Sequence, residues 1–88
     1  MRVPILLAVA TVLGSAQPRD ADRAYTALGA RDYDVAVPAF LAAIQAAPTR
    51  ADLRKDLAYT LLKIGEPTLA RDQLRESMRL DQIGRAHV

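Results

Sequence analysis

The feature that most constrains the fold is an internal similarity with a period of 34 residues. When the chain is shifted against itself by that number, small and apolar positions coincide. The coincident pairs are Ala24 with Ala58, Ala27 with Leu61, Leu28 with Leu62, Ala36 with Ala70, Phe40 with Leu74, and Ala43 with Ser77. A repeat of this length is one supersecondary unit that cannot bury its apolar surface alone. We therefore expect two like units packed side by side.

Each unit is predicted to be a helix, a tight turn and a second helix. Apolar residues at helical spacing form a stripe in the second unit, at Leu57, Ala58, Leu61 and Leu62. Gly65 fits the left-handed position that follows a helix end. The spacing places helices at residues 19–30, 35–47, 52–64 and 68–80. The fold class is therefore all-α, because a core of Ala, Leu, Val and Ile with only 5% aromatic residues suits helix packing better than a β-sandwich.

The helix ends and inward faces follow from local chemistry. Asp32 and Asp34 are available to cap the second helix, and Thr49 begins a capping-box pattern before the third. Pro38 is expected in the first turn of its helix or just past it, where it removes at most one hydrogen bond. The residues expected to face inward are Ala21, Ala24, Tyr25 and Leu28, then Ala36, Phe40, Ala43, Ile44 and Ala47, and finally Ala70, Leu74, Ser77 and Met78.

The period, the helix-turn-helix unit and the recurring small residues resemble the tetratricopeptide repeat (TPR) family. The residues that carry the resemblance are the first-helix alanines Ala24 and Ala58, the second-helix alanines Ala36 and Ala70, and the closing Pro48. The chain departs from the family pattern where Asp20 and Arg54 replace an early tryptophan and Ser77 a late alanine. The resemblance implies a TPR-like α-solenoid of antiparallel helices, with two repeats at residues 17–50 and 51–82.

The resemblance also implies a function, because the first helices of TPR arrays line a concave groove that binds a partner peptide or protein. The candidate partner-binding residues on those helices are Tyr25, Leu28, Lys55, Tyr59, Leu62 and Lys63. Amphipathic tyrosines with flanking lysines suit an extended peptide or a carboxylate. Two alternatives stay open: the tyrosines merely pack between neighbouring helices, and the lysines are ordinary solvated charges. The family's carboxylate clamp needs an asparagine where Tyr25 and Tyr59 stand, so we do not assign it.

Residues for catalysis or metal binding are sparse. The chain has no cysteine, and its one histidine, His87, has no cluster of further ligands around it in the sequence. The glycines are scattered and form no phosphate-binding loop. Residues 17–82 carry ten basic and ten acidic side chains, so their net charge is zero. The sequence therefore predicts neither an enzyme, nor a cofactor or metal site, nor nucleic-acid binding driven by charge.

The first sixteen residues have the layout of a secretory signal peptide. Arg2 precedes an apolar run over residues 3–13, and small residues precede a possible cut after Ala16. The run is too short to span a bilayer, which takes about 20 residues. We expect bacterial export to the periplasm or the medium, with no stable membrane span after cleavage. The alternatives are a buried N-terminal helix of the fold and an uncleaved anchor.

The last six residues, 83–88, correspond to one reading frame of a common sequencing-library adapter. We therefore expect this tail to be artefactual and the natural chain to continue with further repeats. The alternative is a genuine polar tail. Without a following helix, the last repeat exposes Leu74 and Met78, which predicts possible self-association.

The interaction-scaffold hypothesis has two competitors. One is that the repeats form the N-terminal interaction arm of a longer exported protein that serves cell-envelope assembly or polysaccharide export. The other is a cytoplasmic accessory segment of an enzyme.

Overall fold

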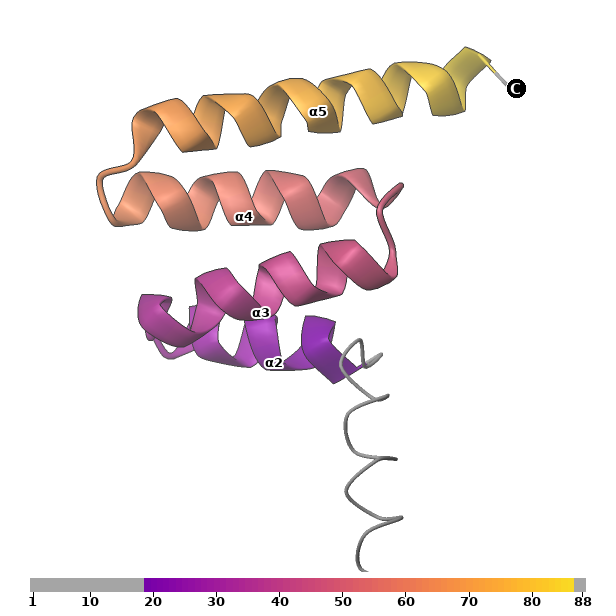
Figure 1. Ribbon diagram of the computed structural model, residues 1–88. Coiled ribbons are helices and arrows are strands. Elements are labelled where there is room, and N and C mark those ends of the chain that lie inside the picture. Colours follow the sequence, from indigo (N-terminus) through magenta and orange to yellow (C-terminus); the bar gives the residue numbers. More distant parts are fainter. Residues whose placement is uncertain (1–18, 87–88) are drawn as a thin grey trace, which may run out of the picture.

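The computed structural model describes residues 19–86, which form four helices and no strand. The helices are α2 (Arg19–Gly29), α3 (Tyr33–Ala46), α4 (Ala51–Lys63) and α5 (Pro67–Ala86). Figure 1 shows them stacked in chain order, each running antiparallel to the one before and packed beside it. The predicted all-α fold is confirmed. The predicted signal peptide, residues 1–16, lies outside the described residues.

The turns inside the two helical hairpins, α2–α3 and α4–α5, close with the same hydrogen bonds. In each turn one residue has a left-handed backbone, Arg31 with φ 60° and Gly65 with φ 80°. Two amide groups then reach back across the helix end, as in a Schellman motif. The bonds are Arg31 N to Leu28 O at 3.0 Å, Asp32 N to Ala27 O at 2.8 Å, Gly65 N to Leu62 O at 3.2 Å, and Glu66 N to Leu61 O at 2.9 Å. The left-handed position predicted for Gly65 is confirmed.

One apolar core runs through all four helices. Its members are Ala24, Ala27, Ala36, Ala39, Phe40, Ala43, Ile44, Leu53, Leu57, Ala58, Leu61 and Ala70. Alanine is common in this core because it lets neighbouring helix backbones approach closely, while Phe40, Leu53 and Leu57 fill the spaces between them. The predicted inward face of the second helix is confirmed, with Ala47 only partly buried.

The inward faces of the other helices were predicted only in part. On α2, Ala24 is buried but Tyr25 is 37% exposed, and Ala27 is buried in its place. On α4, Leu57, Ala58 and Leu61 are buried, whereas Leu62 is 54% exposed. Helical spacing identifies an apolar side of a helix, but the position of the neighbouring helices decides how far round that side is covered.

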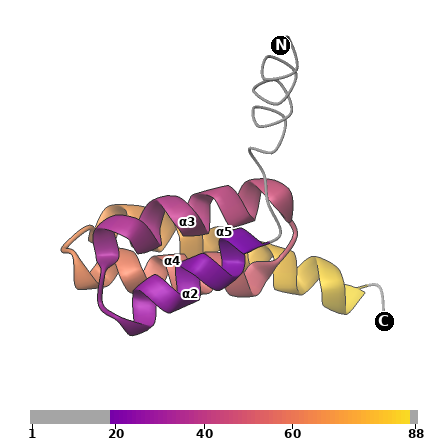
Figure 2. The same ribbon diagram turned by 90° about the horizontal axis from the view of Figure 1, so that it is seen from below.

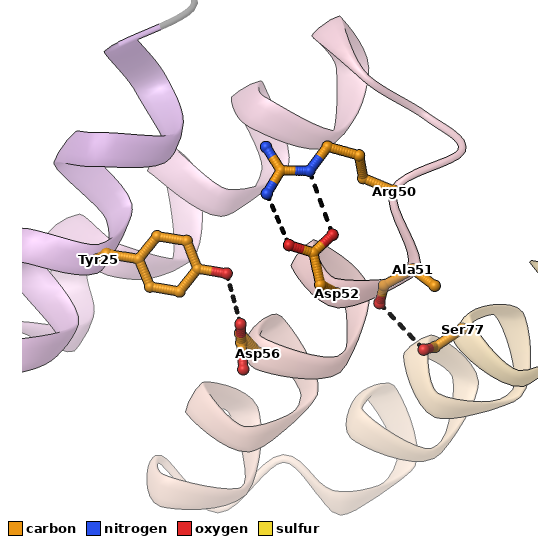
Figure 3. A network of polar contacts seen from close by, with 6 residues as sticks. All are labelled: Tyr25, Arg50, Ala51, Asp52, Asp56 and Ser77. Atoms are coloured by element: carbon orange, nitrogen blue, oxygen red, sulfur yellow. Dashed lines mark hydrogen bonds and ion pairs between the residues drawn. The ribbon is translucent and has the colours of Figure 1, made fainter. Parts of the chain in front are cut away.

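On α5, Ala70 and Ser77 are buried as predicted, and Leu74 and Met78 are exposed, as the sequence predicts where no helix follows. The Ser77 hydroxyl donates a hydrogen bond to the backbone oxygen of Ala51, 3.0 Å away at the start of α4 (Figure 3). A small polar side chain at this position therefore fits the close approach of α4 and α5.

Several predicted helix ends are wrong. Asp32 lies at the N-terminal cap of α3 and Arg50 at that of α4, and neither side chain makes a capping hydrogen bond. At the start of α3 the acceptor is a backbone group instead. The backbone oxygen of Asp32 accepts hydrogen bonds from Val35 N and Ala36 N, at 3.2 and 2.9 Å. Pro38 lies inside α3 just past its first turn, as one form of the prediction had it, because that helix begins at Tyr33.

The last helix is longer than predicted. It continues to Ala86 rather than ending near Leu80, and residues 83–86 form its final turn. Figures 1 and 2 show this end of α5 extending beyond the neighbouring helices. Among residues 19–86, no helix combines the length and the apolar character needed to cross a membrane.

Candidate functional site

The six candidate partner-binding residues lie on α2 and α4, the first helices of the two hairpins. Tyr25 and Leu28 belong to α2, and Lys55, Tyr59, Leu62 and Lys63 belong to α4. The structure separates the two groups: the α2 side chains contact other helices, and the α4 side chains lie mainly in solvent.

Tyr25 packs between helices. Its ring meets that of Phe40 edge to face, with 5.1 Å between the centroids and 87° between the planes. Its hydroxyl points from α2 to α4 and donates a hydrogen bond to the Asp56 carboxylate (Figure 3). Burial, and then the hydrogen bond to Asp56, raises the pKa of Tyr25 well above its ordinary value, because both favour the neutral phenol. Tyr25 therefore joins the two hairpins through their first helices.

Leu28 is also partly structural. It is half-buried and packs against the apolar core. Its backbone oxygen accepts the hydrogen bond from Arg31 that closes the first turn. On α2, then, both candidate residues serve the packing of the fold, which is one of the alternatives left open by the sequence.

The α4 residues form one exposed surface, which we call the α4 face: Lys55, Tyr59, Leu62 and Lys63. These positions share a side of the helix because they are spaced by three and four residues. Tyr59 is 50% exposed, and the Lys63 ammonium lies over its ring at 5.0 Å from the centroid. A cation above an aromatic ring adds an attraction of about 0.5–1 kcal/mol at an exposed site. The α4 face thus combines apolar area with two positive charges.

The acidic side chains beside the α4 face are engaged elsewhere. Asp52 accepts two hydrogen bonds from the Arg50 guanidinium, at 2.6 and 3.2 Å (Figure 3). This contact holds the pKa of Asp52 below its ordinary value. Asp56 accepts from Tyr25. Within residues 19–86, Lys55 and Lys63 form no ion pair, so the α4 face keeps its positive charge.

No family model, curated protein or solved structure matches the chain. The proposal for a function therefore rests on the exposed side chains of the described residues. Among residues 19–86, no group of three or more His, Cys, Asp or Glu side chains is arranged to hold a metal ion.

An open hollow lies between the start of α4 and the end of α5. It is lined by Thr49, Ala51, Asp52, Leu80, Asp81, Gly84 and Arg85. None of the six candidate residues contributes to it. The sequence did not indicate this hollow, because it depends on two segments about 30 positions apart that come together only in the fold.

Asp56 was missed as a partner of Tyr25. The sequence held one clue to this contact. Tyr25 and Tyr59 are 34 positions apart, and Asp56 lies one helical turn before Tyr59. First helices stacked side by side bring one turn of α4 opposite the tyrosine of α2. Local spacing within either helix alone does not show this contact.

Proposed function

We propose that the two hairpins are TPR-like repeats and that the chain is a non-catalytic scaffold which binds a partner protein. The α4 face would contact an extended segment of that partner. The observation that carries the proposal is the half-exposed Tyr59, with the Lys63 ammonium over its ring and the exposed Leu62 beside it.

The repeat interpretation is supported by the periodicity of the backbone. The first helices end at Gly29 and Lys63, and the second helices begin at Tyr33 and Pro67, each pair 34 positions apart. The hydrogen bonds that close the two turns obey the same offset. A sequence period that recurs in helix ends and turn geometry is typical of helical repeat proteins.

The chemistry of the α4 face selects the kind of partner. Tyr59 and Leu62 offer apolar area, and aromatic residues are enriched among the energetically important residues of interfaces. Lys55 and Lys63 lie at the two ends of the face without carboxylate partners in the described chain. We therefore propose an extended peptide that carries an apolar side chain flanked by carboxylates.

The proposal is tested with peptides selected from a random display library against the full chain. We expect acidic, apolar-containing peptides, whose affinity is then measured by fluorescence anisotropy. The double variant Tyr59→Ala with Lys55→Ala should weaken binding by about tenfold or more, since it removes an aromatic anchor and a charge. Its circular dichroism should remain that of the original chain, because both side chains are exposed.

Leu41→Ala is the matched control, because Leu41 is an exposed apolar residue on α3. This variant should bind the selected peptides as the original chain does. Two outcomes would show that the α4 face is not the binding surface. One is undiminished affinity of the peptides for the Tyr59 and Lys55 double variant, and the other is an equal loss of affinity for Leu41→Ala.

A further inference from the structure

A second surface lies on α5 and is independent of the α4 face. Arg71, Leu74, Met78 and Asp81 follow one another at spacings of three, four and three residues, so they line one side of the helix. We call this side the α5 stripe. Leu74 is 37% and Met78 is 61% exposed. The side chains of Arg71 and Asp81 are exposed and form no hydrogen bond or ion pair within residues 19–86.

The equivalent positions on α3 show what this side of a helix does in the fold. Phe40 and Ile44, which precede Leu74 and Met78 by 34 residues, are 0% and 7% exposed. They belong to the core of the stack, in which α3 has a helix on each side, α2 and α4. Within residues 19–86, no helix covers α5 in the same way. Among the described helices, the α5 stripe is therefore a helix-packing surface with no neighbour on its outer side.

The outer side of α2, at the other end of the stack, does not fit the α5 stripe of a second copy. On α4, Leu53 and Leu57 are buried in the core. The equivalent residues of α2 are Arg19 and Arg23, and both are exposed. A second copy that placed its α2 against Leu74 and Met78 would bring two guanidinium groups to an apolar surface, which costs free energy of desolvation. Head-to-tail stacking of copies is therefore disfavoured.

The charges at the two ends of the α5 stripe favour a different occupant. Arg71 and Asp81 replace Val37 of α3 and Ala47 at its C-terminal cap, which both pack against the core. A purely apolar helix would cover these charges without pairing them. An antiparallel copy of the stripe supplies both partners, because Arg71 and Asp81 lie at equal distances from the midpoint between Leu74 and Met78.

We propose that two copies of the chain associate through their α5 stripes, antiparallel and related by a two-fold axis. Leu74 packs against Met78 of the second copy, and Arg71 pairs with Asp81 of the second copy, each contact occurring twice. Such an isologous contact closes on itself and stops at a dimer. The spacing of three and four residues is that of helices packed along a narrow seam.

Arg75 limits the strength of the dimer. It is exposed at the edge of the α5 stripe, and the two-fold axis brings it near Arg75 of the second copy. Two like charges so placed repel each other, and salt screens that repulsion. Removing the charge should therefore tighten the association without changing the fold.

The dimer is tested by sedimentation velocity on the full chain over a range of concentrations. We expect one monomer–dimer equilibrium. Arg71→Asp or Asp81→Arg alone should raise the dissociation constant by about tenfold, because each change turns two ion pairs into two like-charge contacts. Arg75→Ala should lower the dissociation constant. The matched control is Arg23→Asp, an equivalent charge reversal on α2, which should leave the dissociation constant unchanged.

Mixing the two single variants is the decisive measurement. Arg71→Asp and Asp81→Arg should form a heterodimer with each other, since every end contact then joins opposite charges. The double variant with both changes should recover the original affinity. A monomer at all concentrations, an open series of larger species, sensitivity to Arg23→Asp, or a mixture without heterodimer would each overturn the proposal. None of these outcomes depends on peptide binding by the α4 face.

Discussion

At the scale of the residue, two tyrosines at equivalent repeat positions have different roles. Tyr25 packs on Phe40 and donates to Asp56, which belongs to the next hairpin. Tyr59 has the same place on α4, yet within residues 19–86 no further first helix lies beside it. Its ring is half-exposed and contacts Lys63 instead. The position of a residue in the stack therefore decides whether the same side chain is structural or available to a partner.

Replacing Tyr25 with phenylalanine tests this structural role. The ring contact with Phe40 remains, but the hydrogen bond to a carboxylate is lost. We expect the free energy of unfolding at pH 7 to fall by about 1 kcal/mol, a modest value because Tyr25 is partly exposed. Chemical denaturation monitored by circular dichroism measures the difference.

The same comparison predicts a pH dependence. The folded state raises the pKa of Tyr25 above its ordinary value of 10.0, first through burial and then through Asp56. The unfolded chain therefore releases this proton first. The contribution of Tyr25 to stability is complete below about pH 10 and is lost as the pH rises further. The difference in the free energy of unfolding between the original chain and Tyr25→Phe should shrink above pH 10. A difference that stays constant would contradict the hydrogen bond from Tyr25 to Asp56.

At the scale of the element, the two hairpins share a turn that demands a left-handed residue. Glycine adopts this conformation without strain, whereas other L-residues meet a steric cost. Gly65 supplies it in the second hairpin, and Arg31 occupies the equivalent position in the first. The second turn therefore has the less strained backbone, although both turns make the same hydrogen bonds.

Gly65→Ala should destabilise the fold by about 1 kcal/mol, because the added methyl group is strained at positive φ although the space around it is open. Gly29→Ala is the control. Gly29 ends α2, the space that an alanine methyl group would occupy there is open, and alanine is the better helix former. Urea denaturation should show a loss for the first variant and no loss for the second. Equal effects would argue against the left-handed turn.

At the scale of the whole molecule, stability rests on a small core divided among four thin layers. Within residues 19–86, its five larger members are Phe40, Ile44, Leu53, Leu57 and Leu61, and the other seven are alanines. Stacked helical repeats gain stability from each neighbour they cover, and about three are normally needed. Two hairpins with one uncovered apolar surface should therefore be marginally stable as a monomer.

Association through α5 would raise this stability by mass action. The dimer forms only from folded chains, so the midpoint of thermal unfolding should increase with protein concentration. Scanning calorimetry at two concentrations measures the shift. The midpoint of the Met78→Asp variant should not move, because a buried carboxylate breaks the contact. A sharp, concentration-independent transition of the original chain would contradict both the marginal monomer and the dimer.

Much of the fold was predictable from the sequence because the relevant signals are local. Helical spacing located all four helices, and a glycine after an apolar run located the second turn. The inward face of α3 was also predictable, since that helix is covered on both sides. The helix ends were less predictable. The backbone oxygen of Asp32, not its side chain, accepts the hydrogen bonds at the start of α3, and α5 continues past Leu80.

What the sequence by itself determined was therefore the all-helical fold of two hairpins and the side of each helix that is apolar. Only the tertiary structure decided which parts of those sides are covered. It buried Leu53, exposed Leu62 and turned Tyr25 toward Asp56. The physical reason is that spacing along a helix is a property of the chain, whereas burial depends on neighbours that are distant in sequence.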